Sequence, residues 1–154
     1  MNIFAVDSDT EVCARWLDDI RLRKMVLESA QLLSNALYLW KVRRTDYGIY
    51  KPTHLNHPCT KWAAESEANF SWLFSLYISY CKEYTFRTSK RHGSQKLWPY
   101  FYPYYNPDSW PDYWQNSSQH PEMDDVFLAY KLTLLEKWEA DTIPVTFYGE
   151  IFNG

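Results

Sequence analysis

The stretch YKPTHLNHPCTKW, residues 50–62, gathers side chains that can do chemistry. His54 and His57 stand three residues apart, with Asn56 between them and Cys59 two residues beyond His57. Histidine transfers protons near neutral pH and binds metal ions, and a cysteine thiolate is a strong nucleophile. The stretch is therefore the first place to look for a catalytic, metal-binding or anion-binding site.

An anion site is the interpretation that the local sequence favours. Pro58 suits the first turn of a helix because it has no N–H to leave unpaired. Asn56 or His57 would then cap that helix. The free N–H groups at a helix start attract phosphate, and Lys51 and Lys61 are close by in the sequence.

Two other chemistries would use the same residues. His54, His57 and Cys59 are zinc-ligand types, but their spacing is unusual for zinc, and a fourth ligand would have to come from His92 or His120. Cys59 at a helix start would have a lowered pKa, as nucleophilic cysteines do. It also falls on the apolar face of that helix, which is typical of an inert core thiol. We expect no metal ion and no cofactor.

A polar row runs along the helical segment that precedes this stretch. Arg21, Lys24, Glu28, Gln31 and Asn35 recur at steps of three and four residues and so share one helix face. The row is either a solvated surface with an ordinary Lys24–Glu28 ion pair or the lining of a cleft. The amides of Gln31 and Asn35 favour the cleft, because Lys and Glu are the usual residues on a solvated helix.

Helices must position these groups, because apolar residues recur with a 3.6-residue period along most of the chain. In chain order we expect a strand at 2–6, a helix at 10–44, a loop at 45–57, helices at 58–84 and about 125–141, and a strand at 143–149. Asp7 or Asp9 would cap the first helix and Asp124 or Asp125 the third, and a phase shift near residues 18–20 marks a break in the first. The predicted fold class is mainly α, a compact single-domain helical fold with at most a small two-stranded sheet joining the termini.

An unusual segment, WPYFYPYYNPDSWPDYW, covers residues 98–114, where nine of seventeen residues are aromatic and four are proline. The prolines exclude a long regular helix. The rings either pack on one another in an ordered ribbon or form a docking surface for a host protein. The residues of such a partner interface would be Trp98, Tyr102, Tyr105, Trp110 and Trp114. We expect residues 1–154 to form a single domain with this aromatic- and proline-rich insertion at about 98–118.

Charge is distributed unevenly, although the net charge is only −3. Residues 1–100 hold 14 Lys or Arg against 10 Asp or Glu, whereas residues 101–154 hold 2 against 9. The basic turn RTSKRHGSQK, residues 87–96, is either a solvated loop or a phosphate-binding element. A straight helix over 58–84 would be roughly 40 Å long. The turn and the histidine stretch would then be able to share an extended polymer but not one small molecule.

The three cysteines and the hydropathy of the sequence indicate in which cellular compartment the protein is expected. The cysteine count is odd and includes no CxxC pair, which argues against a disulfide framework. No apolar run reaches the length of a membrane span, and the start MNIFAVDSD has no basic leader. We expect a cytoplasmic protein without a membrane partner.

Three stretches carry a resemblance to known proteins: DDIRLRKMVLESAQLLSNAL, YKPTHLNHPCTKWAAESEANFSWL and CKEYTFRTSKRHGS. They resemble a family of small, mostly uncharacterised bacterial and phage proteins that begin MNIF, over about residues 1–95 and 119–145. More distantly, the order of elements is similar to the pyrimidine-dimer DNA glycosylases of the endonuclease V type. That resemblance implies a compact helical fold. It also implies that Asp18 or Asp19 lies near a catalytic carboxylate and that Arg21 and Arg23 bind phosphate.

The chain departs from the glycosylase pattern at its start. Those glycosylases attack the sugar with the amine of an N-terminal threonine that is exposed when the initiator methionine is removed. Here residue 2 is asparagine, whose bulk hinders the removal of Met1. The resemblance therefore supports the fold more than the reaction.

These observations favour a phage- or bacterium-encoded protein that binds or acts on DNA or nucleotides, with glycosylase- or lyase-like chemistry if it is an enzyme. The expected catalytic residues are Glu28, His54, His57 and Asp19. The expected phosphate or nucleic-acid contacts are Arg21, Arg23, Lys24, Asn56, Lys61, Arg87, Lys90 and Arg91. The alternative is a non-enzymatic module that docks a host protein through the aromatic segment.

Overall fold

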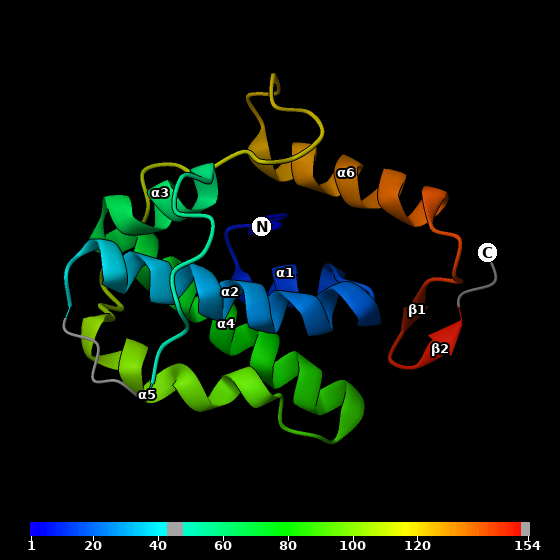
Figure 1. The fold of residues 1–154 in the computed structure, drawn as a ribbon. Coiled ribbons are helices and arrows are strands. Elements are labelled where there is room, and N and C mark those ends of the chain that lie inside the picture. Colours follow the sequence, from blue (N-terminus) through cyan, green and yellow to red (C-terminus); the bar gives the residue numbers. More distant parts are fainter. Residues whose placement is uncertain (43–47, 152–154) are drawn as a thin grey trace.

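The computed structural model describes residues 1–42 and 48–151 (Figure 1). Its helices are α1 (Thr10–Trp16), α2 (Asp19–Leu39), α3 (Pro58–Glu65), α4 (Glu67–Thr88), α5 (Trp98–Phe101) and α6 (Val126–Ala140), with 3₁₀ turns at Gly93–Leu97 and Tyr102–Tyr104. The strands β1 (Thr146–Phe147) and β2 (Glu150–Ile151) form an antiparallel hairpin. The mainly α class expected from the sequence is confirmed.

The first predicted helix divides where its apolar pattern changes phase. Asp18 separates α1 from α2 and caps α2, because its carboxylate accepts the Arg21 N–H (3.1 Å). α2 ends at Leu39, earlier than the predicted end at about residue 44. That predicted end and the first residues of the predicted loop at 45–57 lie outside the described residues.

Two other caps agree with the sequence. The Asp9 carboxylate caps α1 by accepting the Glu11 N–H (2.9 Å), and the Asp125 carboxylate caps α6 by accepting the Leu128 N–H (3.1 Å). Capping depends on a few neighbouring residues, which explains why the sequence alone indicated both positions.

The second predicted helix is broken into α3 and α4. Ser66 adopts an extended backbone, ends α3 and caps α4 with its hydroxyl, which accepts the Asn69 N–H (3.0 Å). The expectation of one straight helix from residue 58 to 84 is therefore wrong. Both helices bury their inner faces against α2, so the apolar stripe continues across the break and conceals it.

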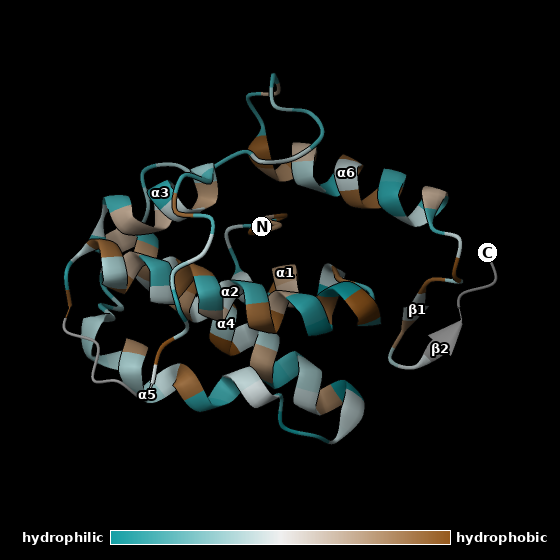
Figure 2. Cartoon of the chain, viewed as in Figure 1, coloured by the Kyte–Doolittle hydropathy of each residue, from teal (hydrophilic) through white to brown (hydrophobic). Residues whose placement is uncertain are grey.

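The core lies between α2 and α4, with α1 packed on α4 and α3 packed on α2 (Figure 1). Its largest fully buried side chains include Trp62, Tyr77, Tyr80, Tyr130 and Phe70. Hydrophobic and hydrophilic residues alternate along α2, α4 and α6 (Figure 2), as expected of helices that each bury one face. Across the described residues, no helix combines the length and the apolar character that a membrane span requires.

The first six residues run into the middle of the molecule and form no strand (Figure 1). The Asn2 side-chain oxygen accepts the N–H groups of Ile3 (2.8 Å) and Phe4 (3.1 Å), and Phe4 has a left-handed backbone with φ 42°. A strand would need those N–H groups and an extended backbone. The expected pairing of residues 2–6 with 143–149 therefore does not form.

The small sheet instead closes within the last described residues. Thr146 pairs with Ile151, and Phe147 pairs with Glu150. Tyr148 (φ 56°) and Gly149 (φ 77°) are both left-handed, as a tight two-residue hairpin turn of type I′ requires. The sheet thus does not join the two ends of the chain.

Candidate functional site

The buried N-terminal segment is fixed by contacts with distant parts of the chain. The Asn2 side-chain amide donates to the Ser117 carbonyl (3.3 Å), and the Tyr80 hydroxyl donates to the Ile3 carbonyl (3.1 Å). Ile3 is fully buried, whereas Met1 and Asn2 are partly accessible. The α-amino group of Met1 is therefore held at a defined place beside buried residues.

His57 caps α3 and lies within electrostatic range of this amino group. Its Nδ1 accepts the Cys59 N–H (3.0 Å), so the neutral ring carries its proton on Nε2. Burial lowers the pKa of His57, and the positive charges of the Met1 α-amino group and of His54 lower it further. At neutral pH His57 is an uncharged imidazole that can donate a hydrogen bond from Nε2.

Glu28, on α2, lies within electrostatic range of the buried Cys59 thiol, whose pKa rises to about 11. Burial is the largest cause; the hydrogen bond to Ser117 and the Met1 α-amino group lower the value, and the Glu28 carboxylate raises it. One thiol therefore lies within electrostatic range of both the amine and Glu28.

The same pKa argues against Cys59 as a nucleophile. The thiolate is the reactive form, and a thiol with a pKa of about 11 is almost fully protonated at neutral pH. Cys59 is fully buried and its thiol donates to the Ser117 hydroxyl (3.3 Å). Cys59 is therefore a packing residue of the core.

His54 has an unusual backbone, with a left-handed φ of 53°. Its carbonyl accepts the His57 N–H (3.0 Å), and the buried Asn35 binds both the N–H (3.1 Å) and the carbonyl (2.6 Å) of Thr53. Left-handed non-glycine residues are uncommon and cluster at functional sites. Asn35, predicted to line a cleft, instead holds the loop that presents the exposed His54 side chain.

The start of α3 offers less to an anion than the sequence indicated. Pro58 has no N–H, the Cys59 N–H is bonded to His57, and the Lys61 N–H is bonded to the His57 carbonyl (3.1 Å). Asn56 and Lys61 are exposed. Phosphate binding at this end of the helix would therefore depend on side chains.

At the first turn of α2, Arg21 is committed to ion pairs. It forms a bidentate pair with Asp141 (2.9 and 3.0 Å) and a further contact with Asp18 (3.0 Å). Asp18 also accepts the Trp138 indole N–H (2.8 Å). Two carboxylates thus neutralise Arg21, and this arrangement argues against the predicted phosphate contact.

Asp19 and Arg87 are also committed to the fold. Asp19 accepts the N–H groups of Tyr148 (2.9 Å) and Gly149 (2.8 Å) and the Arg87 guanidinium (3.1 Å). Burial raises the pKa of Asp19, but these bonds outweigh it and hold the pKa below its ordinary value. The Arg87 side chain is only 1% exposed and also pairs with Glu83 (3.2 Å). These contacts argue against a catalytic Asp19 and a phosphate-binding Arg87.

The basic turn contacts the first residue of the histidine stretch, Tyr50. The His92 ring contacts the Arg23 carbonyl (3.0 Å), and the Tyr50 hydroxyl bonds to the Ser94 hydroxyl (2.7 Å). The break at Ser66 removes the straight helix on which the expected separation of the two segments rested. The exposed cationic residues in and beside the turn include Arg23, Lys90, Arg91 and Lys96.

Lys24 and Glu28 do not form the ion pair expected of a solvated helix face. No salt bridge joins them in the part of the chain that the structure describes. Lys24 is exposed and lines a small cavity of about 170 Å³ together with Arg21 and residues 141–146. Glu28 is half-buried.

A metal centre has no support in the described residues 1–42 and 48–151. No group of three or more His, Cys, Asp or Glu side chains there is arranged to hold an ion. The candidate fourth ligands are engaged elsewhere, because His92 contacts the Arg23 carbonyl (3.0 Å) and His120 contacts Glu136 (2.6 Å).

The aromatic segment divides between surface and core. Trp98, Tyr102 and Trp110 are 44%, 58% and 60% exposed. Tyr105 packs on Phe74 with ring centroids 4.9 Å apart, and Trp114 packs edge-on against Trp72 at 5.7 Å. Three of the five rings predicted for a partner interface are thus accessible, and two complete the packing on α4.

Comparison with known proteins assigns residues 1–97 of the chain to a protein family. A family model described as pyrimidine dimer DNA glycosylase matches residues 1–97, which is more than half of the chain. The chain belongs to this family. Searches of the curated proteins and of the solved structures gave no match.

The match to the pyrimidine dimer DNA glycosylase family ends just before α5. It covers α1 to α4 and all of the candidate groups around the Met1 amine except Ser117. Sequence reasoning had noted residue 2 only for its bulk and had missed its contact with Ser117. One signal in the sequence could have indicated that residue 2 fixes the N-terminal segment. It is the asparagine directly before the apolar run 3–6, because an asparagine side chain readily accepts the backbone N–H groups that follow it.

Proposed function

We propose that this protein is a glycosylase with lyase activity on damaged DNA, and that the α-amino group of Met1 is its nucleophile. The observation that carries the proposal is the fixed N-terminal segment, in which Asn2 bonds to Ser117 and Ile3 to Tyr80, together with the electrostatic influence of the Met1 amine on His57 and Cys59. Membership of the pyrimidine dimer DNA glycosylase family supports DNA as the substrate class.

In the proposed reaction the amine nitrogen attacks C1′ of the damaged nucleotide. The glycosidic bond breaks and its electron pair leaves with the base. The nitrogen then loses its proton and the sugar ring opens, which gives an imine between the protein and C1′. A base removes a proton from C2′, the C3′–O bond breaks with its electron pair on the 3′ phosphate, and water finally hydrolyses the imine.

Glu28 is the proposed base for these proton transfers. Its carboxylate acts electrostatically on Cys59, as the Met1 amine also does, whereas Asp19 is nine residues earlier on α2 and engaged with the hairpin turn. Neutral His57 is the proposed donor to a sugar or phosphate oxygen, and the exposed His54 would contact the same strand. The proposed phosphate contacts are Arg23, Lys24, Asn56, Lys61, Lys90 and Arg91, all of which are exposed.

Reductive trapping tests the nucleophile directly. The protein is incubated with one duplex that contains an abasic site and another that contains a cyclobutane pyrimidine dimer, each with sodium cyanoborohydride. We expect a covalent protein–DNA adduct whose peptide mass map places the DNA on the residue-1 amine. An adduct on a lysine would contradict the assigned nucleophile, and the absence of both adduct and strand cleavage would contradict the function.

The matched control carries a Gly-Ser extension before Met1. It retains a free α-amine but moves that amine two residues away from His57. Its urea unfolding midpoint should match that of the parent, because Asn2 and Ile3 keep their contacts, while the adduct should be lost.

A second candidate function is docking of a host protein through the exposed rings. The observation that favours it is the exposure of Trp98 (44%) and Tyr102 (58%), since exposed aromatics are enriched in interfaces. Deleting residues 98–114 is unsuitable as a test, because Phe101 is fully buried and the fold would suffer. The double variant Trp98→Ser and Tyr102→Ser should instead remain folded and lose a partner that the parent captures.

A further inference from the structure

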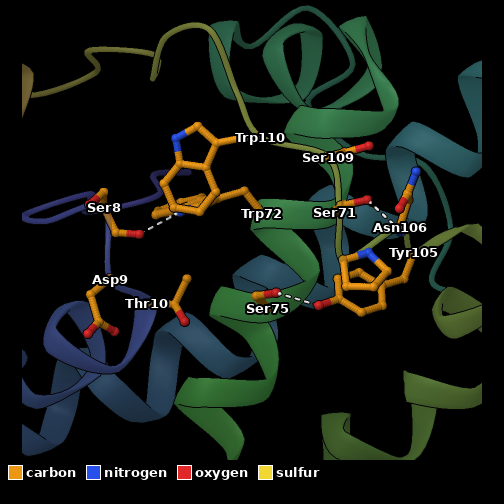
Figure 3. A pocket seen from close by; sticks show the side chains of 11 residues that line it. Ser8, Asp9, Thr10, Ser71, Trp72, Ser75, Tyr105, Asn106, Ser109 and Trp110 are labelled. Atoms are coloured by element: carbon orange, nitrogen blue, oxygen red, sulfur yellow. Dashed lines mark hydrogen bonds between the residues drawn. The ribbon is translucent and has the colours of Figure 1, made fainter.

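A cavity of about 390 Å³ lies between the start of α1, the face of α4 and the aromatic segment (Figure 3). Three rings line it, those of Trp72, Tyr105 and Trp110, together with polar groups that include Ser8 and Asp9. Five of its eleven lining residues belong to segment 105–110, beyond the residues 1–97 matched by the family model. The cavity is therefore built jointly by the matched part of the chain and by a segment beyond it.

The walls of the cavity are fixed without a ligand. The Asn106 N–H donates to the Ser71 hydroxyl (2.9 Å), and the Asn106 side-chain amide (2.7 Å) and the Ser109 hydroxyl (2.9 Å) donate to Glu67. On the other side, the Trp72 indole N–H donates to the Ser8 carbonyl (2.9 Å), as Figure 3 shows. A cavity held in this way loses little flexibility when a ligand enters.

The residues that line the cavity include one carboxylate, that of Asp9, and no Lys or Arg. Asp9 is an exposed lining residue, and only one of its carboxylate oxygens is used to cap α1. Hydrogen bonds from Asn106 and Ser109 lower the pKa of Glu67, which keeps a second carboxylate charged beside the cavity.

Charge and aromatic content together select the ligand class. A phosphate group would find no cation in these walls, which excludes the backbone of DNA as the natural occupant. The faces of tryptophan and tyrosine rings attract cations, and ring clusters with a nearby carboxylate recognise ammonium groups. Trp110, one of the rings that line the cavity, is 60% exposed and so remains accessible to such a group.

We propose that this cavity binds an organic cation, an alkylammonium or guanidinium group, between Trp72, Tyr105 and Trp110 with Asp9 as counter-ion. The same chemistry is offered by a free small amine and by a Lys or Arg side chain of a partner protein. The inference does not rest on the proposed glycosylase function, because it uses different residues.

Titration followed by tryptophan fluorescence tests the charge requirement. Choline and 3,3-dimethylbutan-1-ol have nearly the same shape and differ in charge, so choline should bind about tenfold more tightly. Equal binding of the neutral alcohol, or tighter binding of a nucleoside monophosphate, would overturn the proposal. Acetyl-Gly-Lys-Gly-amide and acetyl-Gly-Arg-Gly-amide identify the source, because tighter binding of a peptide than of choline indicates a partner's side chain.

Two pairs of variants locate the binding to this cavity. Asp9→Asn removes the charge and keeps a helix-capping side chain, so choline binding should weaken about threefold to tenfold while stability is retained. Asp7→Asn removes the same charge two residues away, outside the lining, and should have little effect.

Trp110→Ala should abolish measurable choline binding, whereas Trp98→Ala removes an exposed ring outside the cavity and should leave the binding intact. Unchanged choline binding in Trp110→Ala would overturn the assignment. Strand cleavage by Trp110→Ala should equal that of the parent, so the two proposals can fail independently.

Discussion

The first turn of α2 and the middle of the same helix carry similar charged residues in different states of bonding. Asp18, Asp19 and Arg21 in the first turn each bond to residues beyond α2. Among the described residues, Glu28 forms no ion pair, and its carboxylate acts on the surroundings of the Met1 amine. A carboxylate whose bonds are all used holds the fold together, whereas one without such bonds remains available to accept a proton.

The largest effect should come from removing Arg87, the centre of the bonded cluster. Arg87→Met would leave Asp19 and Glu83 without their cation in a site where the guanidinium is 1% exposed. We expect the free energy of unfolding to fall by about 3–5 kcal/mol in urea denaturation, as for other broken buried ion pairs. Arg91→Met, at an exposed site, should cost less than about 0.5 kcal/mol. A loss below about 1 kcal/mol in Arg87→Met would contradict the structural role.

Glu28→Gln should lower activity and leave stability unchanged, the opposite of what a variant of the bonded cluster should do. We expect strand cleavage at an abasic site to slow about a hundredfold, because proton transfer by a positioned side chain contributes at least that much. The free energy of unfolding should change by less than about 0.5 kcal/mol. Asp19→Asn is the matched comparison, since it should lower stability and leave cleavage per folded molecule intact. If Asp19→Asn lost cleavage and Glu28→Gln kept it, the assignment of the two carboxylates would be reversed.

A smaller effect should follow from loosening the segment that holds the amine. Asn2→Leu removes the bonds to Ile3, Phe4 and Ser117 and is bulky enough to retain Met1. We expect reductive adduct formation to slow about tenfold, the result of losing about 1–2 kcal/mol of hydrogen bonding. Asn2→Asp keeps the acceptor and loses only the donor to Ser117, so its rate should fall between those of Asn2→Leu and the parent. Equal rates in all three proteins would refute a positioning role for residue 2.

The smallest effect concerns His57 and pH. Burial and nearby positive charge lower its pKa, so at mildly acidic pH the folded protein binds fewer protons at this ring than the unfolded chain does. The stability that His57 contributes is therefore present above its unfolded pKa of about 6.5 and is lost as pH falls toward the lower folded value. His57→Asn retains a capping side chain, and its urea midpoint should fall less steeply than the parent's between about pH 7 and pH 5. If the urea midpoints of His57→Asn and of the parent fell equally steeply with pH, the predicted contribution of His57 to stability would be wrong.

Local signals in the sequence predicted much of the fold but little of the site. The caps at Asp9 and Asp125 were recognisable because each depends on a few adjacent residues. The break at Ser66 was missed because α3 and α4 bury their faces against the same helix and continue one apolar stripe. By residue type, Glu28 and Asp19 were equally suitable as catalytic carboxylates. Only the folded structure shows that Asp19 is already engaged in hydrogen bonds.

The rest of the site depends on contacts between residues far apart in the chain. Arg87 bonds to the Leu17 carbonyl (2.7 Å), 70 residues away, and nothing in its own neighbourhood indicates burial. The Met1 amine is positioned by an Asn2 contact that spans 115 residues. Periodicity and spacing describe neighbours along a helix, so they carry no information about such pairs.

The same long contact sets an order for assembly during synthesis. The first residues leave the ribosome long before Ser117, which is itself held by the Tyr130 hydroxyl of α6 (2.9 Å to the Ser117 N–H). Until the chain has grown past residue 130, the apolar run 3–6 lacks part of the surface that will cover it. Contacts of such large sequence separation form slowly. The amine should therefore reach its place among the last steps of folding, so a nascent or truncated chain would be helical and yet unable to trap DNA.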